Sequence, residues 1–192
     1  EGSWTLYVVA VKSPVQRVKR AAPGGEGYVL DPYSVKAMNA YLDVFDRAFA
    51  DYAGPMPRAY FHDSFEYYGA TWTTDFFAEF QARHGYDLRR FIEALFGEGS
   101  DDVVSRVMCD YHETINALHL DYIRRWTTWC NDQDGLSRNQ AHGAPGNLVD
   151  IYAAADIPET EIFRRVDEAQ VPMLKFSSSA ARLKGSPLAS VR

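Results

Sequence analysis

The sequence is short of cysteine, of net positive charge and of long apolar runs, and each shortage excludes a class of protein. Its 192 residues include two cysteines, Cys109 and Cys130, too few for a disulfide-rich scaffold or a zinc site built from several thiolates. The formal net charge of −6 argues against binding to nucleic acid, because no positive field attracts the phosphates. No apolar run approaches the roughly 20 residues that cross a bilayer, so we expect no membrane span.

The remaining composition is that of an ordinary globular domain. Hydrophobic residues make up 46% of the chain, and aromatic residues make up 14%, enough for a large core or a cleft that stacks on rings. The two cysteines lie 21 positions apart in one predicted helix. A helix rises about 1.5 Å per residue, which separates them by roughly 31 Å, far beyond disulfide reach. We therefore predict two free, buried thiols.

Strand-like and helix-like segments alternate along the chain. Runs of β-branched and aromatic residues predict strands at 4–11, 58–62, 136–143, 154–161 and 187–191. Apolar positions with a period near 3.6 predict helices at 34–52, 74–83, 88–96, 100–131 and 175–183. No tight hairpin joins two strands, so the alternation is typical of an α/β fold with a parallel sheet. The segment 4–11 is apolar throughout most of its length, as expected for a strand covered on both faces.

The number of strand–helix units leaves two architectures open. Four or five units fit either a small open α/β domain or part of a (β/α)8 barrel, which typically needs about 250 residues when complete. We favour a partial, truncated (β/α)8 TIM-like barrel over residues 1–192, with parallel strands and covering helices.

Polar residues gather where the predicted parallel strands end, which is where functional groups lie in such folds. They are His62, Asp63 and Glu66, then Arg138, Asn139, Gln140 and His142, and finally Glu159 and Glu161. Carboxylates that converge from separate strands suit glycoside hydrolysis, which uses one carboxyl group as an acid and a second as base or nucleophile. The same pattern would also fit a metal-dependent lyase or isomerase.

Five runs of residues together resemble one known family. They lie at 19–27, 63–66, 84–88, 138–143 and 156–161: Lys-Arg-Ala-Ala-Pro-Gly-Gly-Glu-Gly, Asp-Ser-Phe-Glu, His-Gly-Tyr-Asp-Leu, Arg-Asn-Gln-Ala-His-Gly and Asp-Ile-Pro-Glu-Thr-Glu. In this order and spacing they resemble glycoside hydrolase family 106, the inverting, calcium-dependent α-L-rhamnosidases. The resemblance implies that residues 1–192 form the N-terminal and central part of the catalytic barrel, and that the rest of the polypeptide completes it. It also implies a carbohydrate substrate and a location in the periplasm or outside the cell.

The resemblance implies roles for individual residues. Glu66 corresponds to the general acid, Glu161 is the candidate second catalytic carboxylate, and Glu159 is the candidate calcium ligand. The sequence leaves open which of Glu159 and Glu161 faces the cleft. The candidate substrate-binding residues are Glu26, Asp63, Asn139, His142 and Trp72.

One position departs from the family pattern. The stretch 185–192 resembles a family segment that leads to a general-base glutamate, but Arg192 stands there. A guanidinium with a pKa above about 12 cannot take a proton from water at neutral pH. Either the base lies elsewhere, or the register differs, or the chain is a degenerate carbohydrate-binding fragment that lacks the base.

Overall fold

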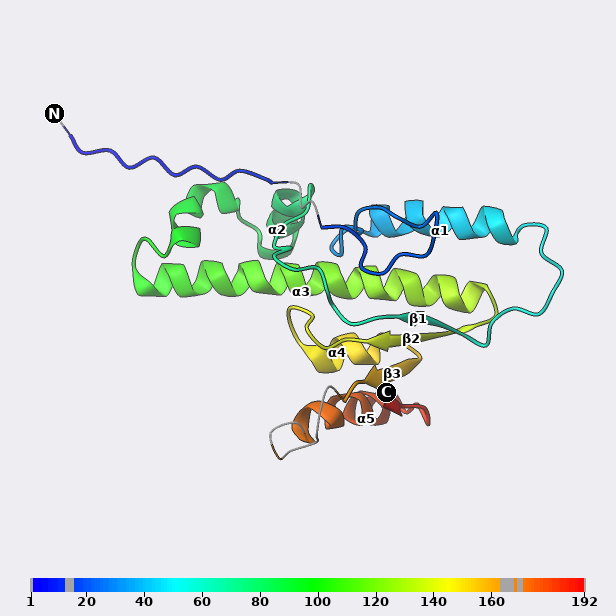
Figure 1. Ribbon diagram of the computed structural model, residues 1–192. Coiled ribbons are helices and arrows are strands. Elements are labelled where there is room, and N and C mark those ends of the chain that lie inside the picture. Colours follow the sequence, from blue (N-terminus) through cyan, green and yellow to red (C-terminus); the bar gives the residue numbers. More distant parts are fainter. Residues whose placement is uncertain (1, 13–15, 163–167, 169–170, 192) are drawn as a thin grey trace.

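The protein is an α/β structure in which helices and short strands alternate (Figure 1). The computed structural model describes residues 2–12, 16–162, 168 and 171–191. The elements in chain order are α1 (Val35–Phe49), β1 (Ala59–His62), α2 (Phe76–His84), the 3₁₀ helix η1 (Leu88–Phe96), α3 (Asp101–Asp132), β2 (Leu136–Gln140), α4 (Leu148–Ala153), β3 (Ile157–Thr160), α5 (Val171–Lys184) and β4 (Ser190–Val191).

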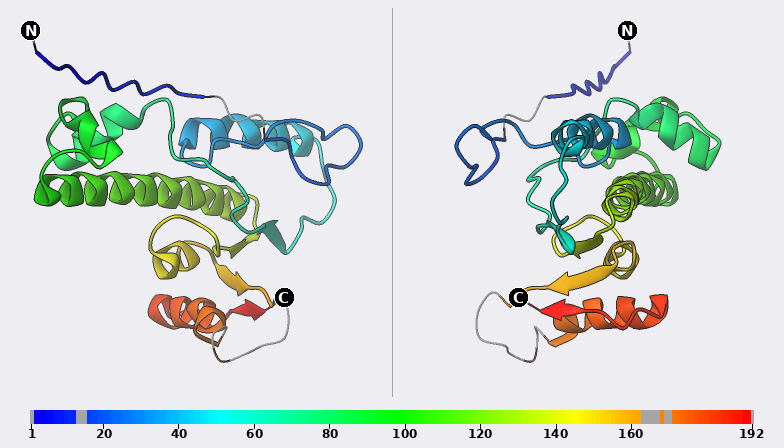
Figure 2. Two further views of the ribbon diagram at one scale, coloured as in Figure 1. Left: turned by 60° about the vertical axis from the view of Figure 1, so that its left-hand side comes forward. Right: turned by 90° about the vertical axis from the view of Figure 1, so that its right-hand side faces the viewer.

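The four strands form one parallel sheet in the order β1-β2-β3-β4, which confirms the predicted α/β class and strand direction. The register pairs His62 of β1 with Asn139 of β2, and Gln140 of β2 with Glu159 of β3. Strands β3 and β4 point the same way beside α5 in Figure 2. Because all four strands are parallel, their carboxyl ends meet at one edge of the sheet, where the candidate residues lie.

The helix boundaries follow from local capping. The Ser34 side chain accepts a hydrogen bond from the Ala37 amide at the start of α1, and Ser100 does the same at the start of α3. Gly85 and Gly97 end α2 and η1 in the left-handed conformation that glycine adopts without strain. The predicted helices at 34–52, 74–83, 100–131 and 175–183 are therefore confirmed within a few residues.

The centre of the helical part is the 32-residue helix α3, which packs against α1, α2 and η1. Trp129 of α3 packs edge-on against Tyr60 of β1, with ring centroids 5.2 Å apart, and stacks on Phe49 of α1. Its indole nitrogen donates to Asp46 Oδ1 at 2.6 Å. This arrangement fixes β1 and α1 on the same long helix.

The predicted thiols are both free, but only one is buried. Cys130 is fully enclosed, and burial raises the pKa of its thiol to about 12. Cys109 is exposed, because it lies on the outer face of α3.

Several predicted elements differ from the structure. The segment 4–11 is extended but is not part of the sheet, and 88–96 is a 3₁₀ helix with a kink at Phe91. The sequence does not predict helix α4, because its six residues directly follow a segment rich in glycine and proline. Among the described residues, none of the helices is long and apolar enough to cross a membrane.

Candidate functional site

The strand residues at the carboxyl edge divide between two faces of the sheet. Tyr60 and His62 of β1 contact Trp129 and Trp126 of α3, so these side chains lie on the helix-covered face. Side chains alternate along a strand. The intervening residues therefore lie on the opposite face, which decides which predicted residues can share a site.

Asn139 lies on the helix-covered face. Its side chain is buried against His62, whose ring contacts Tyr122 and Trp126. Burial lowers the pKa of His62, and the contact with the Asn139 carboxamide partly offsets this. The structure therefore places Asn139, a predicted sugar ligand, beneath α3 instead of on the side where Arg138 and Gln140 lie.

Glu159 lies on the opposite face and is engaged by neighbouring strands. Its side chain has no exposed surface, and it accepts hydrogen bonds from Arg138 Nε and, at 3.0 Å, from Gln140 Nε2. Burial raises the pKa of Glu159, but the hydrogen bonds from Arg138, Ser190 and Gln140 more than offset this and lower it. The Arg138 guanidinium also lies 5.0 Å from the centre of the Phe61 ring. Both oxygens of this candidate calcium ligand are therefore already occupied.

His142 follows β2, and its imidazole lies close enough to residues that follow β1 and β3 to interact with their charges. Burial lowers the pKa of its imidazole, and the negative charges of Glu161, Asp63 and Glu66 act in the opposite direction. The backbone oxygen of His142 accepts a hydrogen bond from the Phe65 amide at 3.2 Å. We call Asp63, Glu66, His142 and Glu161 the acidic mouth. Four predicted site residues are thus brought together.

The next residue keeps two loops in close contact. Gly143 adopts a φ of +82°, and a Cβ atom built on it would lie 3.0 Å from the backbone oxygen of Phe65. A larger residue would be strained in this backbone conformation and would press on the loop that carries Glu66.

Glu66 forms an ion pair with Lys19, with Nζ–Oε1 and Nζ–Oε2 distances of 3.1 and 3.3 Å. The Gln16 side chain donates to the backbone oxygen of Glu66 and accepts from the Tyr68 amide at 3.0 Å. The loop that begins at Gln16 is therefore fixed on the loop that follows β1. The sequence does not predict the contacts of Gln16 and Lys19 with Glu66, because a contact between loops 47 residues apart leaves no periodic signal.

Two further predicted substrate-binding residues, Glu26 and Trp72, make contacts outside the acidic mouth. The Glu26 carboxylate turns back on its own loop and accepts from the Gly24 amide at 2.9 Å. Trp72 packs on Phe76 and Phe77, with ring centroids 4.4 and 4.8 Å apart. It also lines a cavity of about 990 Å³, together with Tyr67 and Tyr68 of the loop that carries Glu66. A cavity of this size can hold a sugar.

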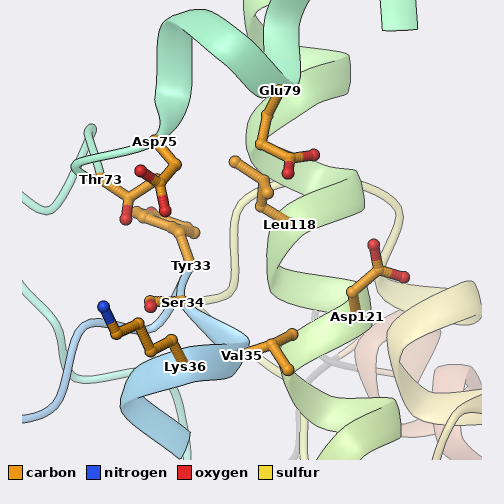
Figure 3. Close-up of a pocket in the computed structure, with 9 residues that line it drawn as sticks. All are labelled: Tyr33, Ser34, Val35, Lys36, Thr73, Asp75, Glu79, Leu118 and Asp121. Carbon is orange, nitrogen blue, oxygen red and sulfur yellow. The ribbon is translucent and has the colours of Figure 1, made fainter. Parts of the chain in front are cut away.

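A second, smaller cavity of about 170 Å³ lies between α1, α2 and α3 (Figure 3). Asp75, Glu79 and Asp121 extend toward it from the helical side of the molecule. It is below the roughly 300 Å³ of ordinary ligand pockets. We therefore do not assign it to the site.

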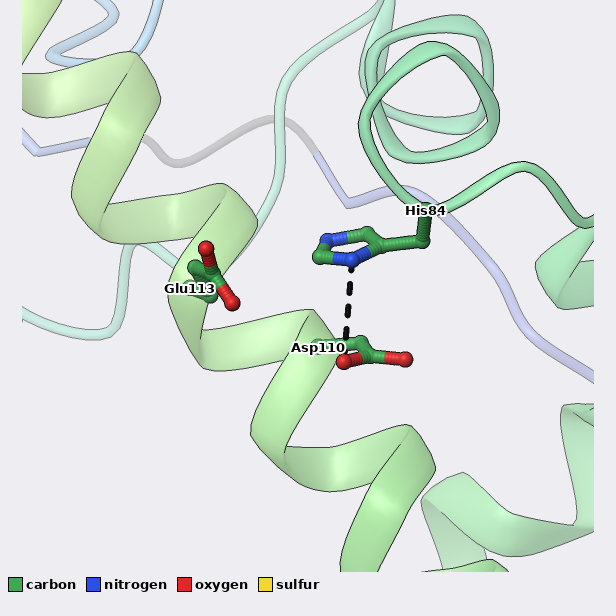
Figure 4. A group of neighbouring side chains, drawn as sticks. All are labelled: His84, Asp110 and Glu113. Carbon is green, nitrogen blue, oxygen red and sulfur yellow. Dashed lines mark ion pairs between the residues drawn. The ribbon is translucent and has the colours of Figure 1, made fainter.

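One cluster in the described part of the chain brings three potential metal ligands together: His84, Asp110 and Glu113 (Figure 4). His84 Nδ1 lies 3.6 Å from Asp110 Oδ1, and His84 Nε2 lies 2.9 Å from the Thr114 hydroxyl. The Tyr86 hydroxyl donates to the other Asp110 oxygen at 2.7 Å. These contacts engage His84 and Asp110 and connect the end of α2 with α3.

The match with known proteins concerns the family and the fold. A family model described as alpha-L-rhamnosidase, for glycoside hydrolase family 106, matches residues 1–191. A protein of Formosa agariphila named "Putative beta-glucuronidase" is 27% identical over 200 residues, covering 98% of this chain and 17% of that protein. The structure of a rhamnosidase from Novosphingobium sp. PP1Y aligns with a TM-score of 0.77 at 24% identity, covering 92% of this chain and 18% of that one. The chain thus spans less than a fifth of either relative.

Proposed function

Because the chain belongs to glycoside hydrolase family 106, we propose that it is part of an enzyme that releases terminal α-L-rhamnosyl residues from glycans. We propose an inverting mechanism, with Glu66 as general acid and Glu161 as the second catalytic carboxylate. In this proposal the sheet is the N-terminal and central part of a (β/α)8 catalytic barrel, and the rest of a longer polypeptide supplies the remaining strands. The open parallel sheet supports this, because its edge strands β1 and β4 each leave one side unpaired among the described residues.

The observation that carries the proposal is the gathering of carboxylates from the ends of β1 and β3 around His142, which follows β2. In inverting hydrolysis, one carboxyl group protonates the leaving oxygen while another carboxylate removes a proton from the attacking water. The two groups must therefore come from different elements and face a shared space. Glu66 follows β1 and Glu161 follows β3, and both charges act on the same imidazole.

Lys19 places a condition on the acid role of Glu66. Its ammonium group lies within hydrogen-bond distance of both carboxylate oxygens of Glu66 in the arrangement observed. A general acid, however, must carry a proton before it reacts. We therefore expect the substrate to displace Lys19 from Glu66, so that the sugar replaces the cation and water around this carboxyl group.

The charge of the acidic mouth favours a neutral sugar over a uronate. It contains three carboxylates, of which Glu66 is paired with Lys19. The lowered pKa of His142 keeps this imidazole neutral near pH 7. A glucuronate carboxylate would meet like charges there, whereas rhamnose is uncharged.

We also propose calcium binding and a location in the periplasm or outside the cell, and both rest on the family alone. Calcium prefers carboxylate and carbonyl oxygens. Glu159 would have to give up its bonds with Arg138 and Gln140 to serve as a ligand, so as found it does not fit an ion. No step of the proposed reaction depends on calcium.

The proposal can be tested in the natural polypeptide that carries these 192 residues. Two α-L-rhamnosides are compared, one with an alkyl leaving group and one with a p-nitrophenyl leaving group. Glu66→Gln should lower kcat on the alkyl rhamnoside by about 10²- to 10⁴-fold, and much less on the activated one, which needs little protonation. Glu161→Gln should slow both substrates to a similar extent. Glu79→Gln, which alters a carboxylate of α2 outside the acidic mouth, is the control and should leave both rates unchanged.

The product's configuration tests the inverting mechanism. Proton NMR of the first sugar formed should show the β-anomer of rhamnose, and the α-anomer would contradict inversion. Rhamnose binding without turnover would support the alternative, a degenerate carbohydrate-binding fragment. Arg192, which bears on that alternative, lies outside the described residues. Release of glucuronic acid from a glucuronide, without turnover of the two rhamnosides, would overturn the proposed substrate.

A further inference from the structure

The cluster of His84, Asp110 and Glu113 is built on elements that carry none of the proposed catalytic residues. His84 is the last residue of α2, and the two carboxylates belong to α3. Asp110 and Glu113 are three positions apart, so they share one face of that helix. Figure 4 shows both on the side of α3 that faces the His84 ring, and the potential ligand atoms all lie within 4.8 Å of one another. One imidazole and two carboxylates are thus brought together from two helices.

The Thr114 hydroxyl decides which nitrogen of His84 carries the ring proton. A hydroxyl has a single proton, and this one is donated to the backbone oxygen of Asp110 at 2.8 Å. In its contact with His84 Nε2 at 2.9 Å, the hydroxyl oxygen must therefore accept, so we assign the proton to Nε2. In the neutral imidazole, Nδ1 then presents its lone pair to Asp110. Metal-binding histidines are usually held in this way, through a hydrogen bond from the nitrogen that does not bind the metal.

The separation between His84 and Asp110 suits a bridging metal ion better than a hydrogen bond. Nδ1 and Oδ1 are 3.6 Å apart, whereas an N–H···O hydrogen bond spans about 2.7 to 3.2 Å. A nitrogen lone pair and a carboxylate oxygen repel each other unless a positive charge lies between them. Two ligand atoms that are each about 2.1 Å from a tetrahedral zinc ion lie about 3.4 Å apart. The Tyr86 hydroxyl holds the other Asp110 oxygen at 2.7 Å, as a partner that orients a metal ligand would.

We propose that His84 Nδ1, Asp110 Oδ1 and the Glu113 carboxylate bind a divalent transition-metal ion of the Zn²⁺ type. Water would complete the four ligands. A mixed nitrogen and oxygen set suits zinc, whereas calcium and magnesium prefer oxygen ligands. Glu113 is exposed and has no hydrogen-bond or ion-pair partner in the described part of the chain, so it can turn to an ion that enters from solvent.

The role of such an ion would be to tie the end of α2 to the long helix α3. Both helices contribute ligands, and α2 already packs on α3. The inference goes beyond the proposed function, and it depends neither on glycosidase activity nor on calcium.

Zinc titration of the natural polypeptide that carries these residues tests the site. The protein is stripped of metal with EDTA, returned to buffer that contains calcium, and titrated with Zn²⁺ in a calorimeter. The parent should bind a single Zn²⁺ per chain that His84→Gln does not bind. Glu113→Gln should weaken this binding at least about tenfold, because a neutral amide replaces a charged ligand. Glu98→Gln changes an exposed glutamate of the helical part outside the cluster, so it is the control and should bind Zn²⁺ as the parent does.

Two further measurements separate a metal site from a structural contact. Without metal, Glu113→Gln should melt at the same temperature as the parent, because its side chain is exposed, so this variant decides the question even if His84→Gln does not fold. Anomalous scattering at the zinc absorption edge, from crystals grown with Zn²⁺, should place the ion between His84 and Asp110. Equal zinc binding by the parent and Glu113→Gln, no zinc binding by the parent, or a zinc peak only elsewhere would overturn the inference. The pair would then be a protonated imidazole beside a carboxylate.

Discussion

The helical part of the molecule and the carboxyl edge of its sheet differ in how completely their buried polar groups are hydrogen-bonded. In the helical part, α3 packs its apolar residues against α1, α2 and η1. Polar groups of this part form hydrogen bonds with one another, as Trp129 does with Asp46 and His84 with Thr114. At the carboxyl edge, Gln140 Oε1 is buried without a hydrogen-bond partner among the described residues. A buried polar atom without a partner costs free energy unless a ligand, water or another part of the polypeptide satisfies it. The comparison indicates that α3 is the scaffold of the described part, and that the carboxyl edge of the sheet holds a polar atom which a ligand, water or another part of the polypeptide would satisfy.

The largest effect should come from the packed part. Trp129→Ala removes a side chain that contacts Phe49 and Tyr60 and donates to Asp46, so the free energy of unfolding should fall by about 4 kcal/mol. Urea unfolding measures this change. A loss below about 1 kcal/mol would mean that α1 and β1 are not held together through this residue.

The next effect concerns a buried histidine of the packed part. Burial lowers the pKa of His119 to about 4, so the unfolded chain takes up a proton near pH 6.5 that the folded chain refuses. Stability should therefore fall by up to about 3 kcal/mol as pH falls from 6.5 to 4, and level off below. His119→Gln should flatten this part of the pH profile, whereas His112→Gln, at an exposed position of the same helix, should not.

A smaller effect is expected at the sheet edge. Glu159→Gln removes the charge that pairs with Arg138 while keeping the shape, and should cost about 2 kcal/mol in urea unfolding at pH 7. Because the pKa of Glu159 is lowered on folding, its contribution is present above the usual range of a glutamate and is lost as pH falls through the lowered value. The difference between variant and parent should therefore shrink in acid. Glu161→Gln is the matched control, and a similar loss of stability there would contradict the separate roles of the two glutamates.

The smallest effect should be on the outer surface of α3. Arg106 and Asp102 form an exposed ion pair one turn apart, and Arg106→Ala should change the free energy of unfolding by at most about 0.5 kcal/mol. Repeating the measurement at high salt should remove even this difference. A large change would show that the surface of α3 contributes to stability as much as its packed side.

The sequence predicted the parallel sheet and most helices because these depend on local periodicity and caps. The sequence does not predict on which face of the sheet each side chain of β2 lies. Arg138, Asn139 and Gln140 are all polar, so no alternation of polar and apolar residues marks the two faces. Only the position of α3 decides that Asn139 turns toward His62 and that Arg138 turns toward Glu159. Predicting that these residues lie at strand ends was therefore possible, but predicting which of them share a site was not.

The predictions for segment 4–11 and for helix α4 differ from the structure for different physical reasons. The segment has strand-like composition, but a strand forms only where another strand offers its backbone groups, and composition does not specify this. Helix α4 had a signal in Asn147, whose side chain accepts from the Val149 amide as a cap, but its six residues are too few to show a period.

The close approach of Gly143 to Phe65 has a consequence for motion. The Phe65 amide is bonded to the oxygen of His142, and the absent Cβ of Gly143 lets the two backbones touch. The loop that carries Glu66 and the loop that carries His142 should therefore move as one body. A substrate that shifts the first would carry the imidazole with it, so the site would open and close as a hinged pair of loops and not as separate side chains.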